Sequence, residues 1–165
     1  MTKALHTNTD PRQRVALVQR YIAGFTYNKT LSRHFHTTLD RPLSMILETA
    51  RYILHGIFHI RCVEAVFAGI ALTQPLREVE RYPLRWKTTH RATETLCKHM
   101  VLAVRIPATP CERGRPPQSG PWLWGCVGLS RELELMNKEC RFRSLHELIE
   151  NFMASYDQCG HDVLR

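Results

Sequence analysis

Residues 60–72 form the stretch that most constrains how this chain can fold. The run Ile60-Arg61-Cys62-Val63-Glu64-Ala65-Val66-Phe67-Ala68-Gly69-Ile70-Ala71-Leu72 contains no proline and carries apolar residues on almost every face. This pattern predicts a helix surrounded by protein rather than a surface helix with one apolar stripe. We therefore expect this helix at the centre of the fold.

Cys62 stands at the beginning of this predicted helix. Unpaired backbone N–H groups and the helix dipole favour a thiolate in the first turn, and Arg61 adds positive charge, so we expect a lowered pKa for the Cys62 thiol. A thiolate there would be a nucleophile. Buried cysteines more often serve as small apolar core residues, so the rest of the chain has to supply a base.

Size and charge set the class of the protein and of its partner. A chain of 165 residues with 44% hydrophobic and 23% charged residues is globular in composition and large enough for one domain with its own core. Its net charge of +8 predicts an acidic partner: nucleic acid, an anionic membrane or an acidic protein segment.

The N-terminal residues lack the apolar core of a signal peptide, and no apolar run reaches the length of a membrane span. We therefore expect a cytosolic protein with no membrane partner. Its six cysteines should then be mostly free thiols, and none forms the Cys-x-x-Cys pair of a zinc ribbon or a thioredoxin-like site.

Apolar periodicity and end signals predict four helices and three strands. Asp10-Pro11 and Pro42 are helix-start signals, Gly24 and Gly56 are stop signals, and Ser144 begins a capping box. The predicted helices are 11–24, 43–55, 62–73 and 145–156, and the predicted strands are 84–88, 99–106 and 122–129. Residues 1–9 are expected to be loose, and the Pro- and Gly-rich segment 107–121 is expected to be a long hairpin loop.

Helices followed by antiparallel strands, with a buried helix that carries a cysteine, predict an α+β fold. The same order is found in papain-like and transglutaminase-like cysteine enzymes, where the nucleophile begins the central helix and a histidine lies on the sheet packed against it. His99 begins the strongest predicted strand, and Ser130 directly follows the third one. Neighbouring strands would let one imidazole nitrogen face Cys62 while the other is held by a group at Ser130.

Several short motifs resemble, in order and nearly in register, the vasohibin family from about Tyr21 to His161. The motifs are Tyr27-Asn28-Lys29-Thr30, Arg41-Pro42-Leu43, Cys62-Val63-Glu64-Ala65-Val66 with Gly69-Ile70 and Leu72-Thr73, Glu80-Arg81-Tyr82-Pro83, His99-Met100-Val101-Leu102, and Gly128-Leu129-Ser130-Arg131 with Leu135-Met136. Vasohibins are transglutaminase-like cysteine proteases that remove the C-terminal tyrosine of α-tubulin. The resemblance thus implies a tubulin tyrosine carboxypeptidase that needs no cofactor or metal.

The resemblance assigns the catalytic residues one by one. Cys62 would be the nucleophile, His99 the general base and acid, and Ser130 the third member, acting in this family largely through its main chain.

The substrate-binding residues follow from the same resemblance. Tyr27 would line the site, and Arg131 with Arg61 would bind the free carboxylate and acidic residues of the substrate. An arginine binds a carboxylate through two parallel hydrogen bonds, and a positive net charge is complementary to a glutamate-rich tail.

The same resemblance also implies a domain organisation, binding partners and a cellular location. We expect residues 1–165 to be one transglutaminase-like domain, with 107–121 as an insertion and with the C-terminal part of the family core absent. The α-tubulin tail and microtubules are the expected partners, at a cytoskeletal location. The small vasohibin-binding protein is a further partner by resemblance, although most of the N-terminal segment that binds it is missing here.

Three alternatives stay open. His55, His59 and Cys62 have the spacing of metal ligands on one helix face, although Gly56 interrupts the helix and no fourth ligand is evident. The positive charge would also suit nucleic acid, but no nucleic-acid-binding motif is present and the basic residues are spread along the chain, so we expect no nucleic-acid partner. A non-catalytic tubulin-binding module is the third alternative.

Overall fold

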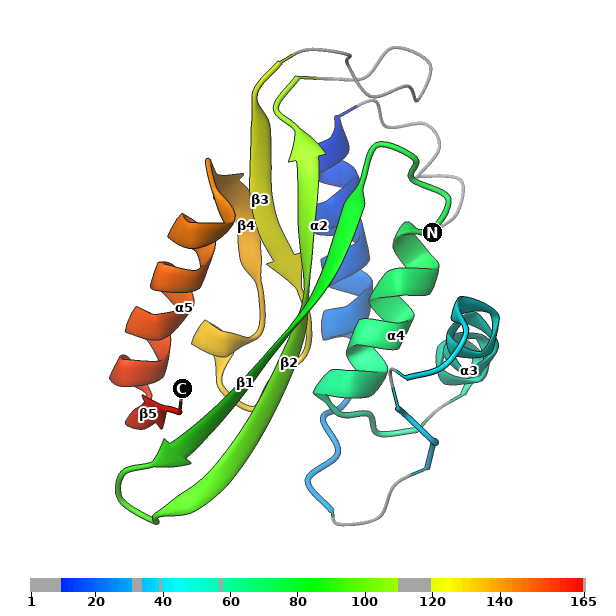
Figure 1. Cartoon of the computed structure of the whole chain (residues 1–165). Coiled ribbons are helices and arrows are strands. Elements are labelled where there is room, and N and C mark those ends of the chain that lie inside the picture. Colours follow the sequence, from blue (N-terminus) through cyan, green and yellow to red (C-terminus); the bar gives the residue numbers. More distant parts are fainter. Residues whose placement is uncertain (1–9, 31–33, 39, 57, 110–119, 165) are drawn as a thin grey trace.

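The computed structural model describes residues 10–30, 34–38, 40–56, 58–109 and 120–164. In that part of the chain, helices come first, strands follow, and one helix lies near the C-terminal end (Figure 1). The elements are α2 (Pro11–Ala23), α3 (Leu43–His55), α4 (Cys62–Thr73), β1 (Glu80–His90), β2 (Thr95–Pro107), β3 (Trp122–Val127), the 3₁₀ helix η2 (Leu133–Leu135), β4 (Lys138–Phe142), α5 (Leu145–Gln158) and β5 (His161–Val163).

All four predicted helices are present, and their ends show why. The Asp10 carboxylate accepts a hydrogen bond from the Arg12 backbone N–H at 2.9 Å, and the Ser144 hydroxyl accepts one from the Glu147 N–H at 3.1 Å. These side chains satisfy backbone donors that the first turn of each helix leaves unpaired. Gly56 ends α3 as expected.

The five strands form one antiparallel sheet in the order β4-β3-β2-β1-β5. This confirms the α+β class and the antiparallel arrangement. Two strands were not predicted: β4 has five residues, three of them charged, and β5 has three residues. The strands β1 and β2 also extend beyond the predicted 84–88 and 99–106, whereas β3 ends at Val127, short of the predicted residue 129.

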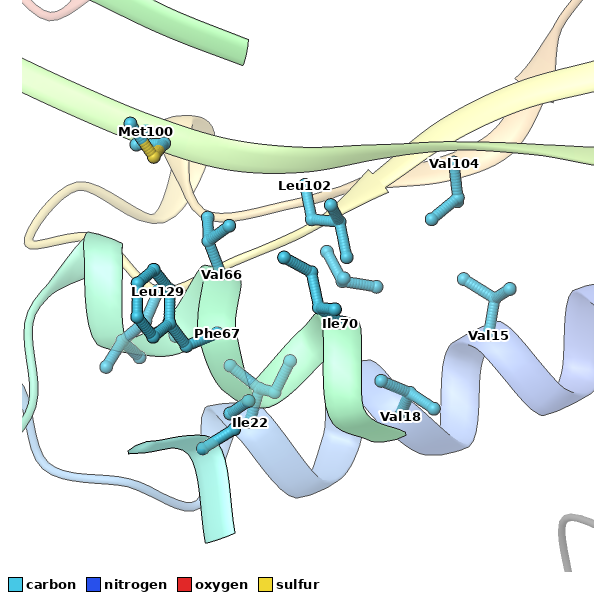
Figure 2. Packing of buried hydrophobic residues seen from close by; sticks show 14 of the residues in the cluster. Val15, Val18, Ile22, Val66, Phe67, Ile70, Met100, Leu102, Val104 and Leu129 are labelled. Atoms are coloured by element: carbon cyan, nitrogen blue, oxygen red, sulfur yellow. The ribbon is translucent and has the colours of Figure 1, made fainter. Parts of the chain in front are cut away.

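Helix α4 lies in the middle of the larger of two apolar clusters, as its all-round apolar pattern predicts. It packs against β2 and α3, with α2 alongside. Figure 2 shows the apolar layer they share, with Val18 and Ile22 from α2, Val66 from α4 and Leu102 from β2. A Cβ atom on Gly69 would lie 3.1 Å from Leu102 Cδ2, so glycine lets α4 approach the sheet closely.

Helix α5 covers the opposite face of the sheet and forms the second apolar cluster. Phe152 and Tyr156 of α5 pack against Trp86 of β1, with ring centroids 4.8 and 5.7 Å apart. The sheet is therefore the middle of three layers, with α2, α3 and α4 on one side and α5 on the other (Figure 1). Alternate residues of β2 serve the two clusters, Leu102 toward α4 and Val101 toward α5.

Strand β3 pairs with β2 only along part of its length. The pairing runs from Leu102 opposite Val127 to Pro107 opposite Trp122, so the N-terminal half of β2 has no partner from β3. The segment after Val127 leaves the sheet there and passes through η2. As a result, residues that follow β3 lie beside the part of β2 that carries His99.

Some sequence predictions fall on residues 1–9 and 110–119, which lie outside the described residues. Among the residues that are described, no helix is both long and apolar enough to span a membrane. The five described cysteines, Cys62, Cys97, Cys126, Cys140 and Cys159, are free thiols.

Candidate active site

A cleft of about 690 Å³ opens where the start of α4, the segment around Tyr27 and the β1–β2 hairpin meet. Five of the six site residues predicted from sequence line it: Tyr27, Arg61, Cys62, His99 and Arg131. They come from four separate parts of the chain, so only the fold brings them together.

Cys62 is the first residue of α4, and its side chain is buried, with 6% of the residue exposed. The start of the helix is fixed by Glu64, whose carboxylate accepts a hydrogen bond from the Arg61 backbone N–H at 3.1 Å. Glu64 is itself buried. A carboxylate at this position satisfies an unpaired donor and interacts favourably with the helix dipole.

The expected lowering of the thiol pKa is wrong. Burial raises the pKa of Cys62, and the charge of Glu64 adds to the rise. Backbone hydrogen bonds from Met100, Val63 and Cys62 itself oppose it without cancelling it, because desolvation of a thiolate is the larger effect. The resting sulfur is therefore a protonated thiol, which needs a base before it can attack.

His99 lies on β2, directly before the residue whose backbone bonds the Cys62 sulfur. Its Nε2 atom lies 2.8 Å from the carbonyl oxygen of Leu135. A carbonyl oxygen only accepts, so Nε2 carries the proton and Nδ1 keeps a lone pair. Burial lowers the pKa of His99, and the Leu135 carbonyl partly offsets this, so the imidazole is neutral at pH 7 and is available as a base.

The group that orients His99 is thus a backbone carbonyl that sequence reasoning did not identify. Ser130, the predicted third member, follows β3 and uses its hydroxyl to accept a hydrogen bond from the Glu132 N–H at 3.2 Å. That hydrogen bond lies in the short segment that leads from β3 to Leu135. A contribution of Ser130 through its main chain and this turn stays a prediction.

The backbone of Tyr27 is held next to the start of α4. Tyr27 forms a parallel bridge with Ile60, with hydrogen bonds from Asn28 N to Ile60 O at 2.7 Å and from Ile60 N to Thr26 O at 3.0 Å. The residue pair 61–62 follows directly, so this bridge fixes Tyr27 beside the start of α4.

Arg131 faces Tyr27 across the cleft, with its guanidinium carbon 5.4 Å from the centre of the ring. Burial raises the pKa of the Tyr27 hydroxyl, whereas the charges of Arg131 and Arg61 and a hydrogen bond from Arg131 oppose that rise. The Arg61 guanidinium also donates a hydrogen bond to the Thr30 carbonyl. A phenol beside arginine side chains is a suitable site for a carboxylate.

The cleft has further basic residues that were not predicted from the sequence. Lys29, Arg85 and Lys98 also line it, together with the carboxyl groups of Asp40 and Glu64. Basic residues are common throughout this chain, so no local pattern in the sequence separates these three from the others.

The structure does not place His55, His59 and Cys62 on one helix, which was the basis for a possible metal site. Helix α3 ends at His55 and α4 begins at Cys62, so His55, His59 and Cys62 do not share one helix face. The His55 Nδ1 atom instead donates to the Arg51 carbonyl at 2.7 Å.

Comparison with known proteins gives two findings. The family model described as Vasohibin matches residues 2–165 of this chain. A curated mouse (Mus musculus) protein, tubulinyl-Tyr carboxypeptidase 1, is 34% identical to it over 149 residues, which is 90% of this chain and 36% of that protein. The chain thus spans little more than a third of the length of this relative.

Proposed function

Since the chain belongs to the vasohibin family, we propose that it is a cysteine carboxypeptidase that removes the C-terminal tyrosine from an acidic protein tail. The family comprises cysteine peptidases of transglutaminase-like fold. The tail of α-tubulin is the proposed substrate, since the mouse relative is a tubulinyl-Tyr carboxypeptidase. We place the activity in the cytoplasm, at microtubules.

One observation carries this proposal. A single cleft holds a buried thiol at the start of a helix and an imidazole whose Nε2 is bound to a carbonyl. Cys62 supplies the nucleophile, and His99, with Nδ1 unprotonated, supplies the base. The Leu135 carbonyl holds the His99 tautomer, and Ser130 stabilises the turn that precedes Leu135.

The proposed reaction begins with proton transfer from the Cys62 sulfur to Nδ1 of His99. The sulfur attacks the carbonyl carbon of the residue before the terminal tyrosine and forms a tetrahedral adduct. Backbone N–H groups of Cys62 and Val63, which already point toward the sulfur, stabilise the oxyanion. The C–N bond then breaks, and His99 returns its proton to the leaving amino group, so tyrosine departs and a thioester remains.

Water completes the cycle. His99 takes a proton from the water, whose oxygen attacks the thioester carbonyl, and the C–S bond breaks. The sulfur recovers the proton from His99, and the shortened chain leaves with a new carboxylate. No metal ion or cofactor is required for any of these steps.

Recognition of the chain end is assigned to the other residues of the cleft. Arg131 binds the terminal carboxylate together with Arg61, and Tyr27 lines the place of the scissile peptide. Because the guanidinium group is planar and permanently charged, it distinguishes a carboxylate from an amide.

The test measures free tyrosine released from a glutamate-rich peptide that ends in tyrosine, with and without a chelator. We expect the chelator to leave the rate of tyrosine release unchanged, and we expect much slower release from the same peptide with an amidated C-terminus. Loss of release with the chelator would contradict a thiol mechanism. If the chain alone is inactive, the assay is repeated with the small vasohibin-binding protein and with microtubules. Microtubule binding without release in any arm would favour the non-catalytic tubulin-binding module.

A further inference from the structure

Two histidines face each other across β1 and β5, at the edge of the sheet. His90 is the last residue of β1 and His161 is the first residue of β5, and the antiparallel register places them directly opposite each other. Their ring centroids are 5.0 Å apart, and the ring planes cross at 79°. Neither residue lines the candidate active site. We call His90 and His161 the histidine pair.

The histidine pair lies on the face of the sheet that α5 covers. Two residues along each strand, Thr88 and Val163 are also directly opposed, and Val163 packs against the apolar cluster under α5. Because side chains alternate along a strand, His90 and His161 share this face. The Tyr156 ring of α5 lies 6.1 Å from the His161 ring. Figure 1 shows β5 beside the end of β1, close to the last turn of α5.

Each ring of the pair is held through its Nδ1 atom. The Thr88 hydroxyl lies 3.0 Å from Nδ1 of His161, and the Thr93 hydroxyl lies 3.0 Å from Nδ1 of His90. No hydrogen bond between the described residues involves either Nε2 atom. Nε2 of His90 lies 4.0 Å from the position that a Cβ atom on Gly160 would take, so it points across to β5. A histidine that binds a metal through one nitrogen is commonly fixed in this way through the other.

The separation of the two rings suits a shared metal ion. Two imidazoles that bind one tetrahedral ion through Nε2, at metal–nitrogen distances of about 2.0–2.1 Å, have ring centres roughly 5 Å apart. The rings of His90 and His161 already have this separation. Both residues are half-buried, so water can reach the site and complete the coordination of an ion.

The charges around the histidine pair also permit a cation. Burial and the neighbouring His90 lower the pKa of His161, so this imidazole is neutral at pH 7, the form that binds a metal. Arg91 follows His90, but its guanidinium is paired with the carboxylates of Asp157 at 2.8 Å and Asp162 at 3.4 Å. Its positive charge is therefore offset.

We propose that the histidine pair binds one divalent transition-metal ion, such as Zn²⁺ or Ni²⁺, through the two Nε2 atoms. Imidazole nitrogen is a preferred ligand of both ions. The bound ion joins β5 to β1, which are otherwise paired over only three residues, and so stabilises this edge of the sheet. Because neither histidine lines the candidate active site, removal of the ion leaves the proposed tyrosine release unchanged.

A second group of potential ligands has to be separated from the histidine pair. Ligand atoms of Glu132, Glu134 and Cys159 lie within 4.8 Å of one another, the two glutamates being exposed and the cysteine half-buried. This group offers a thiol and two carboxylates, whereas the pair offers only imidazoles. A substitution of Cys159 therefore distinguishes the two sites.

The test uses Ni²⁺ alone as the probe and the whole chain with Cys62→Ala, which removes the thiol of the cleft. Titration calorimetry measures affinity and stoichiometry, and thermal unfolding measures the change in Tm. His90→Asn and His161→Asn each remove Nε2 but keep a polar group near the position of Nδ1. The matched control is His146→Asn, which changes an exposed histidine of α5. Unfolding without metal confirms that each variant is folded, and a glutamine variant replaces any asparagine variant that is not.

We expect one ion per chain and a rise in Tm of roughly 3–6 °C when free Ni²⁺ is about ten times Kd. His90→Asn and His161→Asn should each weaken binding at least about tenfold and remove most of the rise in Tm, because one imidazole alone is a weak ligand. The control variant should bind within about twofold of the parent chain.

Three results would overturn the proposal. The first is an unchanged affinity for Ni²⁺ in either His90→Asn or His161→Asn, since both nitrogens are needed. The second is an equal loss in His146→Asn. The third is a loss of binding in Cys159→Ser while the two asparagine variants bind normally, which would place the ion at the group of Glu132, Glu134 and Cys159.

Discussion

The Nε2 atom of His99 lies 2.8 Å from the carbonyl oxygen of Leu135, which is 36 residues further along the chain. This hydrogen bond is possible because β3 stops pairing with β2 at Leu102, which lets the following segment pass beside His99. It holds the imidazole with Nδ1 unprotonated, which is the form that the proposed base needs before substrate binds.

The pH dependence of activity should have only an acid limb near neutrality. Burial lowers the pKa of His99 from its ordinary 6.5, so the neutral base is lost only as pH falls below that value. Burial raises the pKa of Cys62 above 9.0, so no thiol titration occurs between about pH 7 and 9. In measurements of kcat/KM for tyrosine release, a midpoint above 6.5, or a further rise toward pH 9, would contradict this assignment.

Ser130→Ala should reduce kcat by less than about tenfold, because the hydroxyl supports the turn before Leu135 and does not bond His99. His99→Ala should reduce it by roughly 10³-fold or more, since the base is then absent. Ser130→Thr retains a hydroxyl and serves as the control. A loss for Ser130→Ala close to that for His99→Ala would instead make the hydroxyl a direct partner of the imidazole.

Arg131→Ala should remove the preference for a free C-terminal carboxylate. With the unmodified enzyme, the amidated peptide should be cleaved much more slowly than the free acid, because only the acid accepts hydrogen bonds from the guanidinium. In the variant, kcat/KM for the two peptides should become similar. Equal proportional losses of kcat/KM on both peptides would show that Arg131 does not bind the terminal carboxylate.

Gln19→Leu should destabilise the fold near the cleft. The buried Gln19 amide donates to the Gly128 carbonyl at 3.1 Å and accepts from the Gly128 N–H at 2.9 Å. Its loss leaves two buried backbone groups unpaired, which should lower the free energy of unfolding by about 1–3 kcal/mol or more. Arg20→Ala, an exposed change on the same helix, should stay within about 0.5 kcal/mol. Chemical denaturation measures both, and equal stability of the two variants would contradict this role.

The helices could be predicted because their signals are local. Asp10 and Ser144 cap their helices with side chains, and the all-round apolar pattern of 62–72 marks a central helix. The short strands β4 and β5 were missed because pairing with a neighbour, rather than an apolar run, stabilises them. The α+β class therefore follows from the sequence, but the width of the sheet does not.

The site could be predicted in part. Cys62, His99 and Arg131 were found through side-chain chemistry and family resemblance, and the structure places all three in one cleft. The role of the Leu135 carbonyl could not be predicted, because every residue has a backbone carbonyl. Only the path of the chain after β3 shows that this one lies beside His99. The direction of the Cys62 pKa was wrong because burial is set by tertiary packing, which outweighs the local effect of the helix start.

The role of Cys62 is tested most directly by measuring tyrosine release by the wild-type chain and by Cys62→Ala, side by side on the same glutamate-rich peptide. We expect release by the wild type and a loss of at least about 10³-fold in the variant, because no other described residue that lines the cleft supplies a thiol. Binding of the peptide should persist in the variant, which shows that the fold is intact. Equal release by both proteins would show that Cys62 is not the nucleophile.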